Sequence, residues 1–420
     1  MVHYLSSIIL NDPPSNPTRN IAARGRNNRL FLTFVLVVIF VESVHILPLF
    51  SPPVPLLSPQ TPDTSQSRSI NSTMPMDAIK QQSSSPGLSS ESCAICFFGL
   101  PRSFKRLVLP SIVRNILLPN QHHACDVYVH YYQLETEAKG RGPNQGGPLS
   151  TEDILLLKPA VEELTTTITT PHLGIATDNN ATFWEKRGDL LHKYRTTRDP
   201  HDDQHRWLYF PWNAKTYQYP SSIDNIAMQW HSIQSVWEEM ERGERLLHKN
   251  YTRVAMLRSD VFYMTPFDLF RLDATSQQDM SQVVAIPNWA KYPVNDRMIY
   301  GAKRGVQIWA TERFDRLEDH VRTYQYRGYG MHSERFLAHS ILPAIVEHGI
   351  PVMTNPEICF FRTRASGSIW INDCATRAGA AKGYRRQSGN QTKSIIHNIT
   401  GIDCPLEKLT KKIISAQCGT

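Results

Sequence analysis

The sequence contains neither a basic stripe nor a recognisable nucleic-acid-binding module, although it is basic overall. Its 45 Lys and Arg residues against 38 Asp and Glu residues give a net charge of +7, spread along the 420-residue chain. A nucleic-acid-binding domain concentrates such charge on one face or along one helix. The mild excess therefore favours an anionic small molecule as the binding partner over a nucleic acid.

Cysteine is scarce and odd in number, and no second Cys-x-x-Cys follows Cys93-Ala-Ile-Cys96. A zinc or redox site is disfavoured for this reason, and because Cys93 opens an apolar segment in which buried free cysteine is common. All seven cysteines lie after residue 92, where an oxidising compartment would allow disulfide bonds. The odd count leaves at least one thiol unpaired within a monomer.

A stretch without Lys or Arg runs from residue 30 to residue 67, and its first half is strongly apolar. Residues 30–50 read LFLTFVLVVIFVESVHILPLF, with Glu42 and His45 as the interruptions. As a helix this segment rises about 31 Å, which is enough to cross the hydrocarbon core of a bilayer. The sequence therefore predicts a transmembrane helix over residues 30–50.

The charges before this segment predict its orientation. Residues 1–29 hold four arginines and a single acid, Asp12. Positive charge before the segment and none just after it places a short tail in the cytosol, as in a type II signal anchor. A cleaved signal peptide and an Arg-rich organelle transit peptide remain alternatives; the first would need an unusually long n-region and lacks a convincing cleavage site.

Residues 51–92 lack an apolar period and are dominated by Pro, Ser and Thr, which is typical of a disordered stalk. Beyond the apolar segment the chain carries N-glycosylation sequons at Asn71, Asn180, Asn250, Asn390 and Asn398. The earlier Asn16-Pro-Thr is blocked by proline. Together these features predict a single-pass Golgi membrane protein with a lumenal body.

That body, residues 93–375, alternates strand-like and helix-like segments. Strands are expected at 94–98, 125–133, around 254–257, at 283–289 and within 351–365, with a weaker candidate at 165–170. Helical periodicity follows the first strand and returns at 223–240, 305–322 and about 333–348. The alternation predicts one Rossmann-like α/β domain with a largely parallel sheet. Residues 376–420 are basic and poorly patterned, and are interpreted as a C-terminal extension.

Polar residues follow three of the expected strands, where open α/β sheets bind their ligands. They are Leu100-Pro-Arg-Ser103, Arg258-Ser-Asp260 and Asn295-Asp-Arg297, and a fourth cluster, His332-Ser-Glu-Arg335, opens a helix. Arginines bind diphosphates as two-pronged donors, while carboxylates hold divalent metals or act as general bases. The four clusters therefore predict a site for a phosphorylated nucleotide.

Several of these segments together resemble those of a known enzyme family. The predicted anchor and stalk, CFFGLPRSF (96–104), RSDVFY (258–263), VNDRMIYG (294–301) and HSERFL (332–337) are together similar to lumenal, nucleotide-sugar-dependent glycosyltransferases of the GT-A fold class. The resemblance covers roughly residues 93–365. It implies a GT-A-like domain that moves a sugar from a nucleotide-diphosphate donor to a glycan or glycoprotein acceptor.

The resemblance also implies roles for the polar clusters. Arg102, Ser103, Arg258 and Asp260 would bind the nucleotide diphosphate; Asn295, Arg297 and His332 would contact the sugars; Asp296 or Glu334 would be the catalytic base. The family typically carries Asp-x-Asp, which binds a metal, where this chain has Arg258-Ser-Asp260. Either Asp260 ligates Mn²⁺ or Mg²⁺ with help from elsewhere, or Arg258 itself neutralises the diphosphate.

Structural roles compete with these functional ones. Arg258 and Asp260 lie two apart on a strand and could form an exposed ion pair. Asp296 could cap a turn, Glu334 could favour the start of a helix through the macrodipole, and Arg102 could be solvated. His201-Asp-Asp-Gln-His205 has metal-capable spacing that polar loop composition explains equally well, and the aromatic run 207–220 fits sugar stacking or ordinary packing.

Two rival functions come from other classes. A Golgi sulfotransferase would also be basic and membrane-anchored, but the loop after the first strand lacks the run of small residues that a phosphate-cradling turn needs. A non-catalytic sugar-binding protein could keep the transferase fold, since fold does not fix function. Turnover of a nucleotide sugar would exclude the second rival.

Overall fold

The structure is a computed structural model that describes residues 92–137, 146–164, 170–201, 206–211, 217–289, 292–324, 329–371, 374, 389–409 and 412–418. The predicted tail, the predicted span and, except for Ser92, the predicted stalk lie outside these residues, as does Asn71. Most of the strand candidate at 165–170 also lies outside them. Within the described ranges, no helix is both long and apolar enough to cross a membrane.

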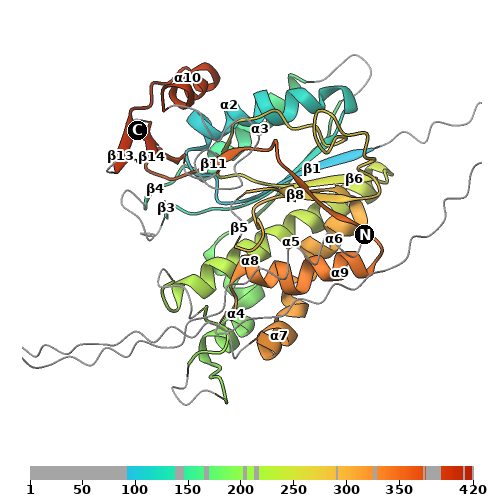
Figure 1. Ribbon diagram of the computed structural model, residues 1–420, viewed down its shortest axis with the longest axis vertical. Coiled ribbons are helices and arrows are strands. Elements are labelled where there is room, and N and C mark those ends of the chain that lie inside the picture. The colour runs from blue at the N-terminus through green and yellow to red at the C-terminus, as the bar shows by residue number, and fades with distance from the viewer. Residues whose placement is uncertain are drawn as a thin grey trace, which may run out of the picture. The chain divides into compact units, whose positions relative to one another are not determined.

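A seven-stranded sheet forms the centre of the domain (Figure 1). Along the chain its strands are β1 (Cys93–Gly99), β2 (Asp126–Tyr132), β5 (Leu173–Asp178), β6 (Arg253–Arg258), β8 (Val284–Pro287), β9 (Ile299–Ala302) and β10 (Val352–Asn355). Their spatial order is β10-β8-β9-β6-β1-β2-β5, and all neighbours are parallel except β9, which is antiparallel to β6 and β8. The prediction of an α/β domain with a largely parallel sheet is confirmed.

Helices cover both faces of this sheet (Figure 1). One face carries a continuous helical run from Phe104 to His123, which includes α2 (Leu109–Ile112), together with the turn Thr151–Leu156 and α3 (Leu157–Glu162). The other face carries α5 (Ser221–Leu247), α6 (Lys303–Thr311), α8 (Ser333–Phe336) and α9 (Leu342–Glu347), with α4 (Asn180–Thr196) and α7 (Arg313–Tyr324) farther out. This sandwich buries both faces of the central strands.

Two prolines that interrupt predicted helices, Pro110 and Pro343, act alike. Pro110 lies in the first turn of α2, which continues a π-helical segment at Phe104–Val108. Pro343 lies in the first turn of α9, which continues a π-helical segment at Leu337–Ile341. Proline has no N–H to donate to the preceding turn, and wide turns accommodate the missing bond. The helices predicted over these residues therefore form as composite runs.

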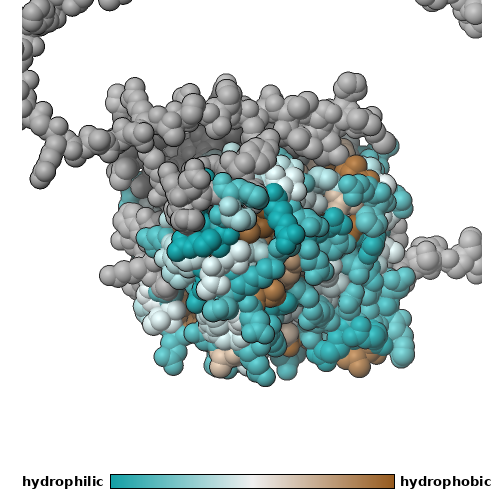
Figure 2. Space-filling model, turned by 90° about the horizontal axis from the view of Figure 1, so that it is seen from below, coloured by the Kyte–Doolittle hydropathy of each residue, from teal (hydrophilic) through white to brown (hydrophobic). Residues whose placement is uncertain are grey.

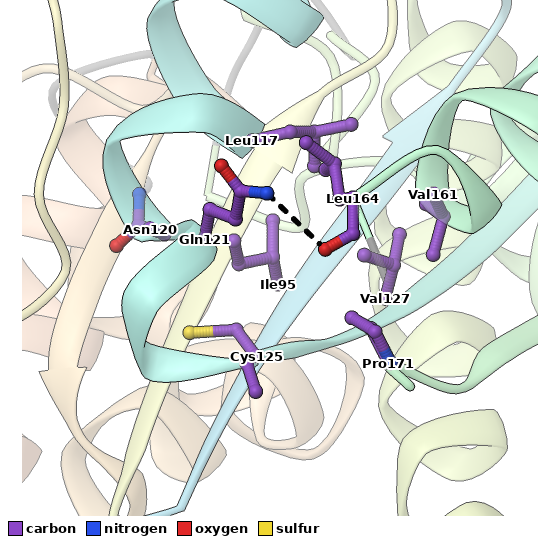
Figure 3. A pocket seen from close by; sticks show the side chains of 10 residues that line it. Ile95, Leu117, Asn120, Gln121, Cys125, Val127, Val161, Leu164 and Pro171 are labelled. Carbon is purple, nitrogen blue, oxygen red and sulfur yellow. Dashed lines mark hydrogen bonds between the residues drawn. The ribbon is translucent and has the colours of Figure 1, made fainter. Parts of the chain in front are cut away.

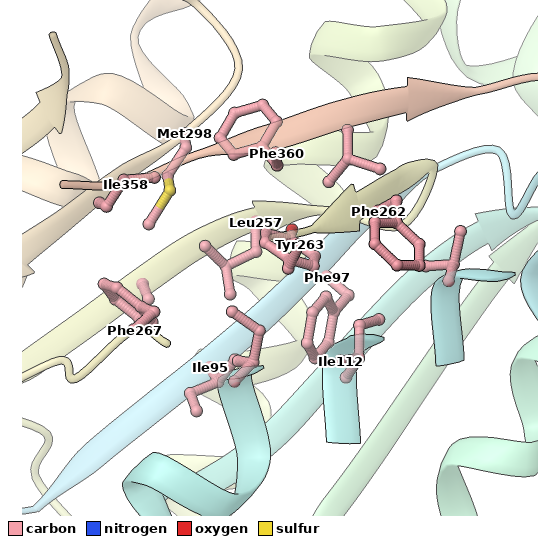
Figure 4. Packing of buried hydrophobic residues seen from close by; sticks show 14 of the residues in the cluster. Ile95, Phe97, Ile112, Leu257, Phe262, Tyr263, Phe267, Met298, Ile358 and Phe360 are labelled. Carbon is pink, nitrogen blue, oxygen red and sulfur yellow. The ribbon is translucent and has the colours of Figure 1, made fainter. Parts of the chain in front are cut away.

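Strand β1 shows why its residues form an uninterrupted apolar run. Ile95 and Phe97 pack with the helical run after β1, whereas Cys96 and Phe98 pack with α5 and α6 on the opposite face. Successive side chains of a strand point to opposite faces, so burial on both faces requires apolar residues at every position. Figure 4 shows the first of these cores, in which Phe97, Leu257 and Ile112 lie together with Phe262 and Phe360.

A second, five-stranded sheet adjoins the first core. Its strands are β7 (Val261–Tyr263), β11 (Phe360–Thr363), β12 (Ser368–Trp370), β13 (Leu406–Leu409) and β14 (Lys412–Gln417), in the order β13-β14-β12-β11-β7. β14 pairs with β12, and α10 (Gly389–Thr400) precedes β13. The described residues after 375 thus belong to a sheet that begins inside the predicted catalytic domain, so they are less separate than the sequence indicates.

Three disulfide bonds join described cysteines: Cys93–Cys125, Cys359–Cys374 and Cys404–Cys418. Cys96 is left as a buried free thiol. Cys93 therefore pairs with a cysteine at the start of β2, not with its near neighbour, and the Cys93-x-x-Cys96 spacing carries no metal or redox motif. Disulfides of this kind persist in oxidising compartments.

The part of the chain between 134 and 221, which shows no clear pattern in sequence, supplies regular elements as well. They are β3 (Thr136–Glu137), β4 (Gly147–Pro148), the edge strand β5, and α4, which begins with a capping box between Asn179 and Thr182. The helical surface seen in Figure 2 is largely hydrophilic, with hydrophobic residues in small separate groups. Scattered exposed apolar residues are normal on a soluble surface.

Candidate functional site

The connections of the central sheet place a switch point between β1 and β6. From β1 the chain moves outward through β2 to β5, then returns through α4 and α5 to add β6 on the other side of β1. Open α/β sheets bind ligands outside the carboxyl ends of the strands at such a point. The loops after β1 and β6 carry Arg102 and Arg258–Asp260, so the predicted diphosphate residues lie at this position.

The loop after β1 is held in a specific conformation. Gly99 has φ 105°, and its N–H donates to Ser232 Oγ on α5 at 2.9 Å. Ser103 has φ 48°, a left-handed conformation that is costly for a residue with a side chain. Its Oγ donates to the carbonyl of Arg364 at 2.7 Å, which ties the loop to the second sheet. The Ser103 hydroxyl therefore positions the loop.

Asp260 is the centre of this edge, and its side chain is 1 % exposed. Arg258 donates two parallel hydrogen bonds to the Asp260 carboxylate, from Nε to Oδ1 at 2.6 Å and from Nη2 to Oδ2 at 2.7 Å. Arg102 donates to Oδ2 through Nη1 and to Glu137 Oε1 through Nε at 2.6 Å. Two-pronged guanidinium–carboxylate pairs combine strength with fixed geometry. The exposed ion pair considered from sequence is thus a largely buried one.

The charges of these groups reinforce one another. Burial alone would raise the pKa of Asp260, but Arg258 and Arg102 outweigh it and hold that pKa well below its ordinary value. Burial alone would lower the pKa of Arg258, but Asp260 and then Asp296 outweigh it and raise that pKa. Asp260 is therefore an anion and Arg258 a cation throughout the physiological range.

Arg364 adds a further cation from the turn after β11. Burial, followed by repulsion from Arg362 and Arg102, lowers the pKa of Arg364 to about 10. Its buried Nε has no hydrogen-bond partner among the described residues, and Nη1 makes only a 3.4 Å contact with the carbonyl of Thr363. A buried donor without a partner is energetically costly. The sequence does not single out Arg364, because nothing distinguishes it from Arg362 at the end of the predicted extended segment 351–365.

Glu334 and Asp296 form a second charged group next to the first. Burial and the nearby charge of Asp296 raise the pKa of Glu334 to about 7. Asp296 is 9 % exposed and also interacts electrostatically with Arg258, which links the two groups. A carboxyl group with a pKa near neutral pH is suited to take up or release a proton during a reaction. The structure thus brings together both catalytic candidates and the diphosphate candidates.

The remaining predicted site residues have distinct positions. Asn295 is buried and uses its amide internally: Nδ2 donates to the carbonyl of Trp289 at 3.0 Å, and Oδ1 accepts from the backbone N–H of Arg297 at 3.0 Å. Arg297 lies over the Trp289 ring at 5.3 Å, and its charge counteracts the raised pKa of Glu334. His332 Nδ1 lies 3.3 Å from Glu334 Oε2. Asn295 holds the loop, whereas Arg297 and His332 adjoin Glu334.

A third charged group was missed by sequence analysis. His130 on β2, Asp178 at the end of β5 and His231 on α5 are all buried and converge, with Nε2 of each histidine 3.1 Å and 2.7 Å from Asp178 Oδ2. Lys186 reaches Asp178 Oδ1 at 2.7 Å. His130 Nδ1 lies 2.8 Å from Ser232 Oγ, which also holds Gly99. Through Ser232, this group therefore helps to hold the loop after β1 in place.

The ligand atoms of His130, Asp178 and His231 lie within 4.8 Å of one another, a spacing that could accommodate a metal. The hydrogen bonds argue against one. Arg187 Nε donates to His231 Nδ1 at 3.1 Å, so the proton of neutral His231 is on Nε2, the atom that a metal would need. Burial lowers the pKa of His231 to about 4, which keeps this ring neutral. The group is a hydrogen-bond network centred on an ionised aspartate.

The other predicted sites are placed as follows. His201 is exposed, and the rest of the His201–His205 motif lies outside the described residues. In the described part of the aromatic run 207–220, Trp207 and Tyr219 stack on each other at 4.9 Å, and Arg198 covers Trp207. Asn180, Asn250, Asn390 and Asn398 are all exposed.

Two cavities differ in what they can hold. One lies among Ile95, Leu117 and Val127 beneath the helical run (Figure 3) and has a volume of about 10 Å³, which is space for one water at most. The other, of about 210 Å³, lies beside the loop after β1 and is lined by Ser103, Lys105 and others, including Cys418 near the C-terminus. It is smaller than the roughly 300–1,000 Å³ of typical ligand pockets, so it fits only part of a ligand of that size.

No protein-family profile matches the sequence, and no curated protein matches it. Among solved structures, the chain is similar to the apo form of mouse xyloside xylosyltransferase 1. The similarity covers 62 % of this chain and 84 % of that one, with 11 % sequence identity and a TM-score of 0.31. A likeness at this level carries no conclusion about activity, and the functional assignment depends on the charged groups described above.

Proposed function

We propose that the protein is a nucleotide-sugar-dependent glycosyltransferase of the GT-A class. The observation that carries this proposal is the juxtaposition of two charged groups at the sheet's switch point. One is an arginine-rich group around Asp260, and the other is a carboxyl group, Glu334, whose pKa burial and Asp296 raise to about 7. Transfer of a sugar from a nucleotide diphosphate needs both an anion-binding site and a proton acceptor.

In this proposal Arg102 and Arg258 face the diphosphate of the donor. When the bond between the anomeric carbon and the β-phosphate oxygen breaks, its electron pair stays on the phosphate. Guanidinium groups near that oxygen stabilise the developing charge, and they do so more strongly in a partly buried site than in water. Asp260 keeps both arginines in position through three of their N–H groups.

Glu334 is the proposed general base. As the acceptor hydroxyl oxygen bonds to the anomeric carbon, its proton passes to the Glu334 carboxylate. Asp296 next to it keeps the proton affinity of Glu334 high, and His332 and Arg297 flank it. An acid–base group works best when its pKa lies close to the working pH.

The cellular setting is part of the proposal. Disulfide bonds join six cysteines, and the four sequon asparagines within the described residues are exposed, as N-glycosylation would require. These features support a lumenal body in the secretory pathway. We propose a type II Golgi protein anchored through residues 30–50, which acts on a glycan or glycoprotein.

Ligand binding tests this function directly. The full-length chain, made in a secretory host and purified in detergent, would be titrated with UDP, GDP, CMP and the sulfotransferase product PAP while thermal unfolding is followed. A ligand that binds only the folded protein raises the melting temperature. We expect a rise with UDP or GDP. A rise with PAP alone would support a sulfotransferase instead, and the absence of any rise would support a non-catalytic protein.

A further inference from the structure

The carboxylate that would hold a metal in this site is already occupied. Asp260 Oδ1 accepts from Arg258 Nε, and Oδ2 accepts from both Arg258 Nη2 and Arg102 Nη1. Mg²⁺ binds oxygen at about 2.0–2.1 Å and demands near-octahedral geometry. A cation at that distance would lie against two guanidinium groups of like charge. The donor set therefore does not fit the divalent metal that the resemblance implies.

The neighbouring residues do not supply a replacement. The first position of the expected Asp-x-Asp is Arg258, a donor with no lone pair for a metal. Throughout the described ranges, the groups of three or more metal-capable side chains are His122, His123 and Asp268, and His130, Asp178 and His231. Neither group contains Asp260, Asp296 or Glu334.

We propose that Arg102, Arg258 and Arg364 take the place of a metal, so that this chain binds the diphosphate of its donor without a divalent cation. The inference rests on the proposed function, since it concerns the donor of that reaction. In this respect the chain differs from the family that it resembles, because side chains supply the positive charge that a metal would supply.

Two of these arginines keep donor groups available. Among described residues, hydrogen bonds from Arg258 use Nε and Nη2, and those from Arg102 use Nε and Nη1. The two side chains are 17 % and 18 % exposed, so each keeps part of its surface accessible. A guanidinium that is anchored on one side and free on the other is positioned in advance for a phosphate oxygen.

Arg364 provides an electrostatic reason for this site to bind an anion. It is crowded by Arg362 and Arg102, and its Nε is buried without a partner in the described part of the chain. An anion bound between Arg364 and Arg102 would satisfy that donor and relieve the repulsion. Charge-assisted hydrogen bonds to phosphate are among the stronger ones in proteins. The ligand therefore improves a site that is strained electrostatically without it.

Binding of UDP and GDP to the full-length protein would be measured by calorimetry in EDTA and again in excess Mn²⁺. We expect affinities that agree within about twofold, because the metal contributes nothing. Arg364→Gln should weaken binding by about tenfold or more through loss of a charge-assisted contact. The control Arg322→Gln removes an equal charge from an exposed position on α7, 70 % exposed, and should leave the affinity unchanged.

A second variant restores the family's pattern. Arg258→Asp creates Asp-x-Asp, and binding should then become dependent on Mn²⁺, since the metal gains a second carboxylate. Should this variant not fold, the Arg364→Gln comparison still decides. Binding that disappears in EDTA and returns with Mn²⁺, or an unchanged affinity in Arg364→Gln, would overturn the inference while leaving the glycosyltransferase proposal intact. Absence of nucleotide binding in both conditions would overturn both.

Discussion

Two buried aspartates in this protein have similar charged surroundings. They differ in whether the donors around them are used up by contacts within the protein. Asp178 and Asp260 are 3 % and 0 % exposed, and cationic or N–H donors surround each of them. Around Asp178 the histidine donors end within the protein, in a network that reaches Ser232 and Gln234, and only the Lys186 side chain beside them, 53 % exposed, extends to the surface. Around Asp260, Arg258 and Arg102 each retain an amino group that makes no hydrogen bond within the described residues. A closed network indicates support of the fold, whereas an open one indicates a ligand site.

Glu334 gives the sharpest test of this contrast, because no cation offsets its burial enough to keep it ionised. Glu334→Gln should lower kcat by about 10²–10⁴-fold through loss of the general base. The same change should stabilise the protein at pH 8 by on the order of 1 kcal/mol, because the folded carboxyl group titrates near 7 and its ionisation above that pH costs stability. Steady-state kinetics and chemical denaturation measure the two effects. A variant that loses stability and keeps its activity would contradict the assignment.

Asp178→Ala should show the reverse pattern. Removing the shared acceptor leaves the buried Nε2–H of His130 without its partner and that of His231 with only the longer 3.3 Å contact to Ser235 Oγ, so the free energy of unfolding should fall by about 2–4 kcal/mol. The affinity for UDP or GDP, measured on the fraction that remains folded, should change far less. Asp189→Ala, at an exposed position of helix α4, which follows β5, is the matched control and should cost under about 0.5 kcal/mol. Equal losses in the two variants would break the comparison.

Acid should weaken the closed network through its histidines. Burial lowers the pKa of His231 to about 4, against an ordinary value near 6.5, so the unfolded chain binds more protons between these pH values. Stability is therefore complete above pH 6.5 and falls as the pH drops toward 4, by about 2–3 kcal/mol for this group alone. Denaturation curves across this range measure the loss. His231→Gln should flatten them; an unchanged slope would remove His231 as the cause.

The smallest expected effect concerns Asp296. Its charge is the second cause of the raised pKa of Glu334, after burial. Asp296→Asn should therefore move the acidic limb of the pH–rate profile to lower pH by about one unit, equivalent to about 1.4 kcal/mol. Asp315→Asn on α7 serves as a control for charge removal elsewhere. A limb that stays in place would show that burial alone sets the proton affinity of Glu334.

Sequence reasoning succeeded where burial imposes a pattern. The apolar run of β1, the helical periodicity of α5 and the strand before Arg258 are all visible in sequence, because residues buried on one or both faces must repeat. Edge strand β5 was missed, since its half-exposed residues and Gly174 obscure the alternation. Helix α4 was missed because its apolar residues form no clear stripe.

The charged groups of the candidate site are likewise visible in sequence only where they interrupt a local pattern. Polar residues that interrupt apolar strands stand out, and in this way the sequence predicts that Arg102, Arg258 and Asp260 lie in one group, as they do in the structure. Asp178, which lies 48 and 53 positions from His130 and His231, becomes a partner of both only through the pairing of β5 with β2 and the packing of α5. Arg364 depends on a turn of the second sheet. Neither relationship has a local signal in the sequence.

The end of the chain has a practical consequence for work on this protein. Cys418 forms a disulfide bond with Cys404, and its backbone N–H donates a hydrogen bond to the carbonyl of Gly367. Cys418 also lines the cavity beside Ser103. A truncation that removes β14 and Cys418 would therefore remove part of the wall of this cavity. Expression vectors should therefore carry their affinity tags ahead of residue 92.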